Sequence, residues 1–153
     1  MQSFTQLCLI QALRTFPIAE KAVVLMDPFD TKDALFLRSQ GVQVLDPLED
    51  RMGDVVCMLS LLRQAHQDPA IGDRDLQLMR QAKTKIPKDG LLYLSIPIAK
   101  DGLIGISYRV YGESRMKKLF QGWRPVGYFG YSYEDVLNET SDAKEPVIVL
   151  RSL

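Results

Sequence analysis

The chain has 153 residues, 46% hydrophobic and 25% charged, which predicts one domain over residues 1–153 and leaves no need for a second. Its 19 basic and 19 acidic residues cancel, and this argues against the wide basic surface that nucleic-acid binding needs. No apolar run approaches the ~18 residues of a membrane helix. Cys8 and Cys57 both fall in apolar stretches, as buried thiols do, so we expect a cytoplasmic protein without disulfides or a metal site.

The first part of the chain predicts one β-α-β unit behind an N-terminal helix. Apolar residues at helical spacing predict an amphipathic helix over residues 3–16, ended by Pro17. A buried strand is expected at residues 22–26 and a helix at residues 32–40. Gly41 stops that helix, and a second strand follows at residues 42–45.

The second part continues the alternation. A buried strand is predicted at residues 54–59, a helix capped by Asp73 at residues 73–85, and a strand at residues 91–96. A loop leads from that strand to a helix at residues 114–121. Two further strands, joined by an acidic polar loop, are expected at residues 123–131 and 146–151, and Trp123 is assigned to the core.

These elements indicate an α/β fold. Continuously apolar strands between helices predict a mostly parallel sheet of about six strands, covered on both faces, with the C-terminal strands partly antiparallel. The connection at residues 46–53 is too short for a helical crossover, which indicates loss of a helix layer and an edge strand. The domain divides into four parts. Residues 1–17 form the N-terminal helix and residues 22–96 the core of β-α-β units. Residues 97–131 form the edge of the site, and residues 132–153 form an acidic loop and the last strand.

Charge is unevenly distributed. Residues 80–124 carry 10 basic and 3 acidic side chains, whereas residues 1–79 carry 7 and 11 and residues 125–153 carry 2 and 5. The basic block surrounds the loop that follows the strand at residues 91–96, where open α/β folds place ligands. It would suit an anionic small molecule, although a solvated helix face gives the same composition.

The candidate site residues lie at strand ends and in this loop. Arg109 could hold a carboxylate or phosphate while its tyrosine neighbours contact the ligand, or it could fix the loop to the protein. The sole histidine, His66, has no nucleophile at a recognisable spacing, so no catalytic residue is assigned. The candidate ligand-binding residues are Asp27, Asp46, Ser95, Lys100, Asp101, Tyr108, Arg109, Tyr111 and Arg115.

Two sets of residues carry a resemblance to known families. Residues 88–97 are similar to the turn and fifth strand of Rossmann-like S-adenosylmethionine-dependent methyltransferases. Several motifs within about residues 54–131 resemble the family first noted in nematodes as domain of unknown function 268, and these motifs are Ser95 to Gly102, Arg109 to Gly112, Arg115 and Gly122-Trp123. The resemblance implies a methyltransferase-like domain in a shortened form.

Departures from the methyltransferase pattern decide what we expect of function. Glycine in the turn after the first strand lets backbone N–H groups approach the cofactor, but residues 27–31 read Asp-Pro-Phe-Asp-Thr and contain none. In the uncharacterised family a histidine precedes the arginine, and here that position is Tyr108. We therefore expect a degenerate domain, a pseudoenzyme without a cofactor.

Such a domain would bind an anionic small molecule or a protein partner, with the helix at residues 3–16 as the surface for a partner or homodimer. The alternative is a divergent S-adenosylmethionine-dependent methyltransferase acting on a small molecule or glycan. In that case Asp46 would hold the ribose and Arg109 would orient the substrate.

Overall fold

The structure, a computed structural model, describes residues 3–18, 22–25, 31–45, 55–57, 73–104, 108–139 and 143–153. Its central feature is a six-stranded sheet in the order β2-β1-β3-β4-β8-β7. The strands are β1 (Ala22–Leu25), β2 (Gln43–Leu45), β3 (Val55–Cys57), β4 (Leu91–Ser95), β7 (Trp123–Phe129) and β8 (Val147–Ser152).

The sheet has a parallel part and an antiparallel part. β1 pairs in parallel with β2 on one side and β3 on the other, and β3 pairs in parallel with β4. β8 is antiparallel to both of its neighbours, β4 and β7. The α/β fold is thus confirmed: β2, β1, β3 and β4 are parallel, and β8 runs antiparallel between β4 and β7.

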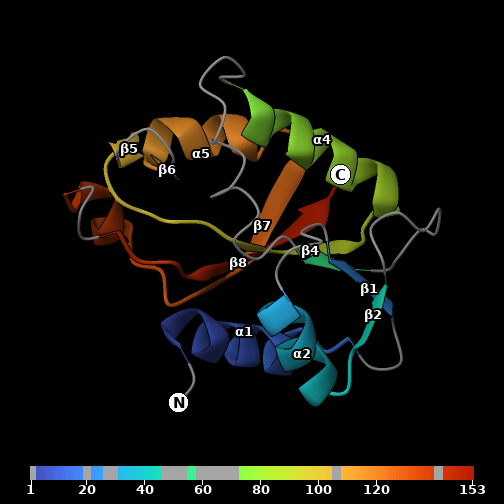
Figure 1. The fold of residues 1–153 in the computed structure, drawn as a ribbon. Helices are drawn as coiled ribbons and strands as arrows, with labels where there is room; N and C mark the ends of the chain where they lie inside the picture. Colours follow the sequence, from blue (N-terminus) through green and yellow to red (C-terminus); the bar gives the residue numbers. More distant parts are fainter. Residues whose placement is uncertain are drawn as a thin grey trace.

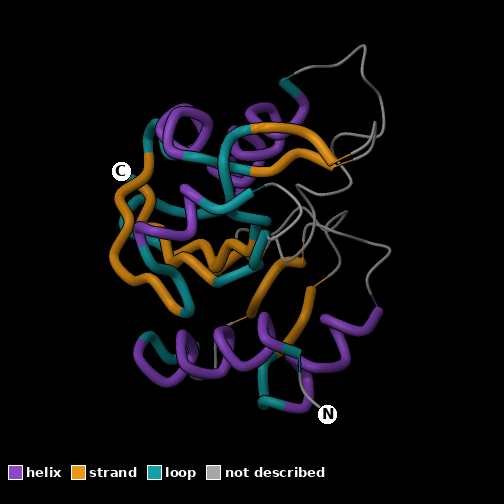
Figure 2. The backbone as a smooth tube through the Cα atoms, turned by 90° about the vertical axis from the view of Figure 1, so that its left-hand side faces the viewer, coloured by secondary structure: helices purple, strands orange, loops and turns teal. Residues whose placement is uncertain are grey.

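Helices cover both faces of the sheet, as predicted. They are α1 (Phe4–Thr15), α2 (Thr31–Ser39), α4 (Arg74–Lys85) and α5 (Glu113–Leu119). Figure 1 shows α1 and α2 on one face and α4 and α5 on the other, and the view in Figure 2 shows the strands between these two layers. Each layer closes its own hydrophobic cluster, so the core has two halves separated by the sheet.

Helix α1 begins at a capping box, in which Ser3 and Gln6 bond reciprocally to each other's backbone N–H groups. Its apolar stripe of Cys8, Leu9 and Ala12 is buried. The helix packs on β4, β8 and β7 rather than on the strands that directly follow it in the chain. The reason is that α2, whose Leu37 is fully buried, covers the other half of the same face.

The sequence also left two short elements unrecognised. A hairpin of β5 (Gly102–Ile104) and β6 (Tyr108–Val110) forms in the stretch expected to be a loop. A 3-10 helix, η1 (Tyr133–Leu137), interrupts the acidic loop before β8. Runs of three to five residues are too short to show a helical or strand period.

The ends of the helices agree in part with those predicted from the sequence. Gly41 has φ +78°, the left-handed conformation expected at the end of α2. Asp73 occupies the N-cap position of α4, but its side chain makes no capping hydrogen bond. Its carboxylate instead pairs with Arg115, 3.3 Å away. Trp123 is buried, as predicted.

Candidate functional site

Three of the candidate side chains converge on the carboxylate of Asp75, a residue that is not among the candidates predicted from the sequence. This residue lies in the first turn of α4 and is only 2% exposed. Arg115 of α5 reaches it with two hydrogen bonds, from Nη2 to Oδ1 at 2.5 Å and from Nε to Oδ2 at 3.0 Å. The two parallel bonds are the strong, directional arrangement typical of an arginine with a carboxylate.

Two more side chains, those of Tyr111 and Arg109, contact the Asp75 carboxylate. The Tyr111 hydroxyl donates to Oδ2 of Asp75 at 3.1 Å, and the ring of Tyr111 is fully buried. The Nε atom of Arg109 lies 3.6 Å from the same oxygen, an ion-pair distance. We call Asp75, Arg109, Tyr111 and Arg115 the Asp75 cluster. It ties α4 to α5 and to the chain that enters α5.

Burial and charge determine protonation in the cluster. Burial of the phenol raises the pKa of Tyr111, and the charge of Asp75 and its hydrogen bond raise it further, so the hydroxyl is protonated at neutral pH. For Arg115 burial lowers the pKa, but the hydrogen bonds and attraction to Asp75 and Asp73 outweigh burial and the net pKa is raised. The cluster therefore holds a protonated phenol and a permanently charged guanidinium.

The raised pKa of Tyr111 predicts that its contribution to stability is lost at alkaline pH. Because the folded protein holds this proton more tightly than the unfolded chain, the contribution to stability is complete below a pH of about 10 and declines as the pH rises above that value. Tyr111→Phe should lower the free energy of unfolding by about 1 kcal/mol near neutral pH. Urea unfolding at increasing pH should show this difference shrinking.

Tyr133→Phe is the matched control, because Tyr133 is exposed. Its effect on the free energy of unfolding should be small. A constant difference between wild type and Tyr111→Phe across the alkaline range would show that the Tyr111 phenol does not titrate as described.

Asp101 has a structural position at the start of α5. Its carboxylate accepts hydrogen bonds from the backbone N–H groups of Gly112, Ser114 and Arg115, at 2.7, 3.2 and 3.3 Å. A Cβ on Gly112 would lie 2.5 Å from the Asp101 backbone nitrogen, so only glycine fits there. Asp101 thus satisfies N–H groups that a helix start leaves without partners.

The remaining candidates are dispersed. Lys100 is exposed and pairs with Glu139 at 3.1 Å, and Ser95 is buried at the end of β4 with no hydrogen-bond partner for its hydroxyl among the described residues. Asp27 and Asp46 lie outside the described residues. Tyr108 is in β6, but its side chain is not described. The structure brings together Arg109, Tyr111 and Arg115, and their role in binding a ligand stays a prediction.

A signal for Asp75 was present in the sequence. The buried residues of α4 and its C-cap are 75, 78, 79, 82 and 86, and four of these are the apolar Leu78, Met79, Ala82 and Ile86. Asp75 is the one charged member of that helical stripe. A carboxylate in an apolar stripe needs a cation from elsewhere in the fold, and the basic loop downstream supplies it.

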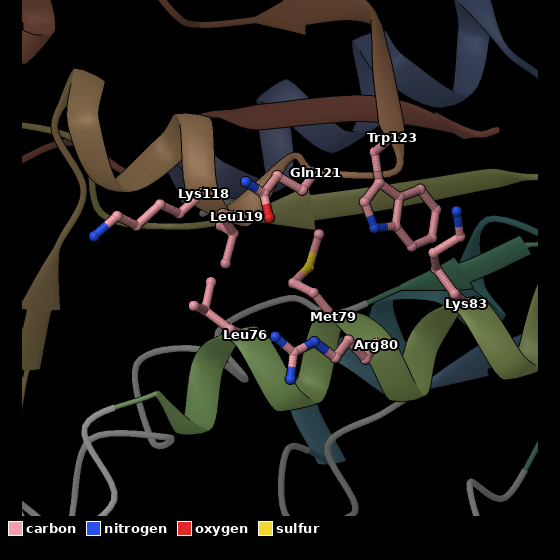
Figure 3. Close-up of a pocket in the computed structure, with 8 residues that line it drawn as sticks. All are labelled: Leu76, Met79, Arg80, Lys83, Lys118, Leu119, Gln121 and Trp123. Atoms are coloured by element: carbon pink, nitrogen blue, oxygen red, sulfur yellow. The ribbon is translucent and has the colours of Figure 1, made fainter.

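A small pocket lies between α4 and the α5–β7 corner (Figure 3). We call it the α4–α5 groove, and its volume is about 50 Å³. Its floor consists of the apolar side chains Leu76, Met79, Leu119 and Trp123. Its rim consists of the polar side chains Arg80, Lys83, Lys118 and Gln121.

A second pocket, of about 280 Å³, lies between the C-terminal ends of α1 and α2 and is lined by Leu13, Arg14, Ile18 and Val42 among others. Within the described parts of the chain, no group of three or more histidine, cysteine or acidic side chains could hold a metal ion. None of the described helices is long and apolar enough to cross a membrane.

Comparison with solved structures places this fold beside methyltransferases. TehB from Haemophilus influenzae aligns with a TM-score of 0.57 at 10% identity, over 95% of this chain and 61% of that one. A 1,6-didemethyltoxoflavin-N1-methyltransferase from Burkholderia thailandensis, solved with S-adenosylhomocysteine, gives 0.61 at 14% identity, over 94% and 77%. A Clostridium acetobutylicum S-adenosylmethionine-dependent methyltransferase gives 0.54 at 10%, over 97% and 91%. The protein thus has an α/β fold resembling methyltransferases.

The family follows from the sequence. Residues 44–148 match the family described as "Caenorhabditis protein of unknown function, DUF268", and the chain belongs to this family. No curated protein matches the chain. The chain spans 61% of the length of TehB.

Proposed function

We propose that this domain is a non-catalytic binding protein, a methyltransferase-like fold that interacts with a partner or an anionic ligand without using S-adenosylmethionine. The observation that carries the proposal is the turn after β1. The neighbouring strands β1 and β3 are followed in the chain by α2 and α4, which lie on opposite faces of the sheet, and ligands of open α/β sheets bind at such a switch point. Residues 26–30, which follow β1, contain no glycine and include Pro28 and Phe29.

Within this proposal, the Asp75 cluster favours a partner over an anionic ligand held by the loop arginines. Arg109 and Arg115 are both candidate ligand-binding residues of the basic loop, and both face the buried carboxylate of Asp75. A guanidinium already neutralised by a buried carboxylate has less to offer an external anion. This contact favours a role for the loop arginines in fixing the fold.

The N-terminal helix stays a proposed partner surface. Its buried stripe packs on its own sheet, but Phe4 and Leu7 on the same helix are about half exposed. In the proposed contact these two side chains would face the partner.

The alternative, a divergent methyltransferase, is supported by the fold neighbours and by Asp46, the residue after β2. An acidic residue near this position holds the ribose in nucleotide-binding folds of this type. In that case S-adenosylmethionine would bind, and Asp46→Asn would abolish binding.

Calorimetric titration with S-adenosylmethionine and S-adenosylhomocysteine separates the two functions. We expect no heat of binding and no change in melting temperature at millimolar cofactor, with an active methyltransferase of this fold as the positive control. A ligand at 100 times its dissociation constant stabilises a protein by about 2.7 kcal/mol, which raises the melting temperature by several degrees. A rise of that size, lost in Asp46→Asn, would establish the methyltransferase function instead.

A further inference from the structure

The α4–α5 groove has the composition of a docking site for one apolar side chain surrounded by acidic groups. Met79, Leu119 and Trp123 are buried in its floor, whereas Arg80 and Lys118 on its rim are exposed. The side chains of Arg80 and Lys118 make no hydrogen bond or ion pair with any part of the chain that the structure describes. Both cations are thus available to a partner.

The size of the groove indicates the kind of partner. Small-molecule sites typically have ~300–1,000 Å³, and this pocket has about 50 Å³. Space of that order accommodates part of one side chain, as in interfaces where a single anchor residue fills a pocket on its partner. A purely inorganic anion would leave the apolar floor unused.

Lys83 gives the groove a fixed wall. Its Nζ atom donates to the carbonyl oxygens of Gly122 and Leu153, at 2.7 and 3.3 Å, and lies 5.6 Å from the centre of the Trp123 ring. This side chain therefore holds the β7 end of the groove to α4. The floor is preformed, which reduces the entropy cost of docking.

A segment of the same chain has the complementary chemistry. In η1, Asp135 and Val136 are buried, whereas Tyr133 and Leu137 are 62% and 59% exposed. The exposed Glu134 lies beside them, and the exposed Glu139 follows two residues after Leu137. Glu139 contacts Lys100, but an exposed pair of this kind is weak and can exchange partners.

The exposed face of η1 is also preformed. Ser132 and Asp135 form a capping box, and the Asp135 carboxylate lies 3.6 Å from Nζ of Lys144. The charge distribution of the chain agrees with a basic groove and an acidic η1. Residues 80–124, which contain the groove cations, carry 10 basic and 3 acidic groups, and residues 125–153, which contain η1, carry 2 and 5. The groove and η1 thus belong to regions of opposite charge.

We propose that η1 of a second copy of this chain docks in the α4–α5 groove. Leu137 enters the pocket, and Glu134 and Glu139 face Arg80 and Lys118 of the neighbouring copy. The two surfaces are different, so the contact is head to tail, and a pair of copies keeps one free groove and one free η1 for further copies. This contact rests on the proposed binding function, because it gives that function a partner. It needs no cofactor, so the contact can be disproved while the proposed function stands.

Reversing the charges of each surface by substitution tests the proposed contact. Light scattering and sedimentation from micromolar to millimolar protein should show an average mass of the wild type that rises with concentration and falls with salt, because salt screens exposed charges. Arg80→Glu/Lys118→Glu and Glu134→Lys/Glu139→Lys should each stay monomeric alone. Mixed in equal amounts they should associate again, since each supplies the charge that the other needs.

A matched control separates this contact from general repulsion. Lys88→Glu/Arg124→Glu has the same net charge as the groove variant but changes exposed residues that do not line the groove, and it should associate as the wild type does. Trp123 is the only tryptophan of the chain, so its fluorescence reports from the floor of the groove and should change on association. Leu137→Ala should remove both the mass increase and the fluorescence change.

Three results would overturn the proposal. The first is a wild type that is monomeric at every concentration, and the second is a mixture of the two charge variants that remains monomeric although both are folded by circular dichroism. The third is binding of a duplex DNA oligonucleotide that Arg80→Glu/Lys118→Glu abolishes while the wild type does not self-associate. That third result would identify the groove as a nucleic-acid surface.

Discussion

Asp75→Asn is expected to lower the free energy of unfolding by about 3 kcal/mol or more, within the ~3–5 kcal/mol range for breaking a buried ion pair. Asparagine keeps the size of the side chain but removes the charge. Arg115 and Arg109 are only 12% and 20% exposed, so their positive charges would remain partly buried without a counter-charge. Denaturant unfolding followed by circular dichroism measures the change.

Asp73→Asn is the control for this prediction. Asp73 is two residues away and contacts the same Arg115, but its side chain is 70% exposed. Exposed pairs contribute ~0–1 kcal/mol, so this variant should differ little from wild type. Equal effects of the two substitutions would show that burial of Asp75 does not determine the strength of the cluster.

Leu9→Ala is expected to lower the free energy of unfolding by about 2–5 kcal/mol, the usual cost of a cavity in a packed core. Leu9 is fully buried in the cluster that also contains Tyr93, Val147 and Val149. The Tyr93 hydroxyl, in addition, donates to the carbonyl oxygen of Phe16, at the end of α1. Deletion of residues 1–17 should therefore give insoluble or molten protein.

Leu7→Ala is the matched control within the same helix. Leu7 is 48% exposed, so its truncation should leave the denaturation midpoint nearly unchanged. A protein that lacks residues 1–17 and remains soluble, monomeric and cooperatively folded would contradict the role given to α1. Light scattering and thermal melts distinguish these outcomes.

Local patterns were sufficient for most of the elements. Pro17 and Gly41 marked the ends of α1 and α2, and continuous apolar runs located β4 and β8. These signals are reliable because they depend on backbone geometry and on burial of a whole segment. The two layers of helices followed from the same alternation of elements.

The site depended on contacts that local patterns do not contain. The sequence placed Arg109, Tyr111 and Arg115 among its candidates because they lie in or just after the loop that follows the strand at residues 91–96. Their partner is more than thirty residues earlier in the chain. Asp101 was predicted as a ligand-binding residue, and in the structure its carboxylate caps α5. This capping role is visible only when the turn that brings it back is known.

The position of β8 affects how the protein is made. β8 lies between β4 and β7 although it follows both in the chain. During synthesis, β4 and β7 leave the ribosome first, and each presents an open hydrogen-bonding edge until residues 147–152 arrive. Open edges are templates for pairing with other chains. A nascent chain halted before residue 147 would therefore contain a gap one strand wide, which the β8 segment of a neighbouring molecule could fill.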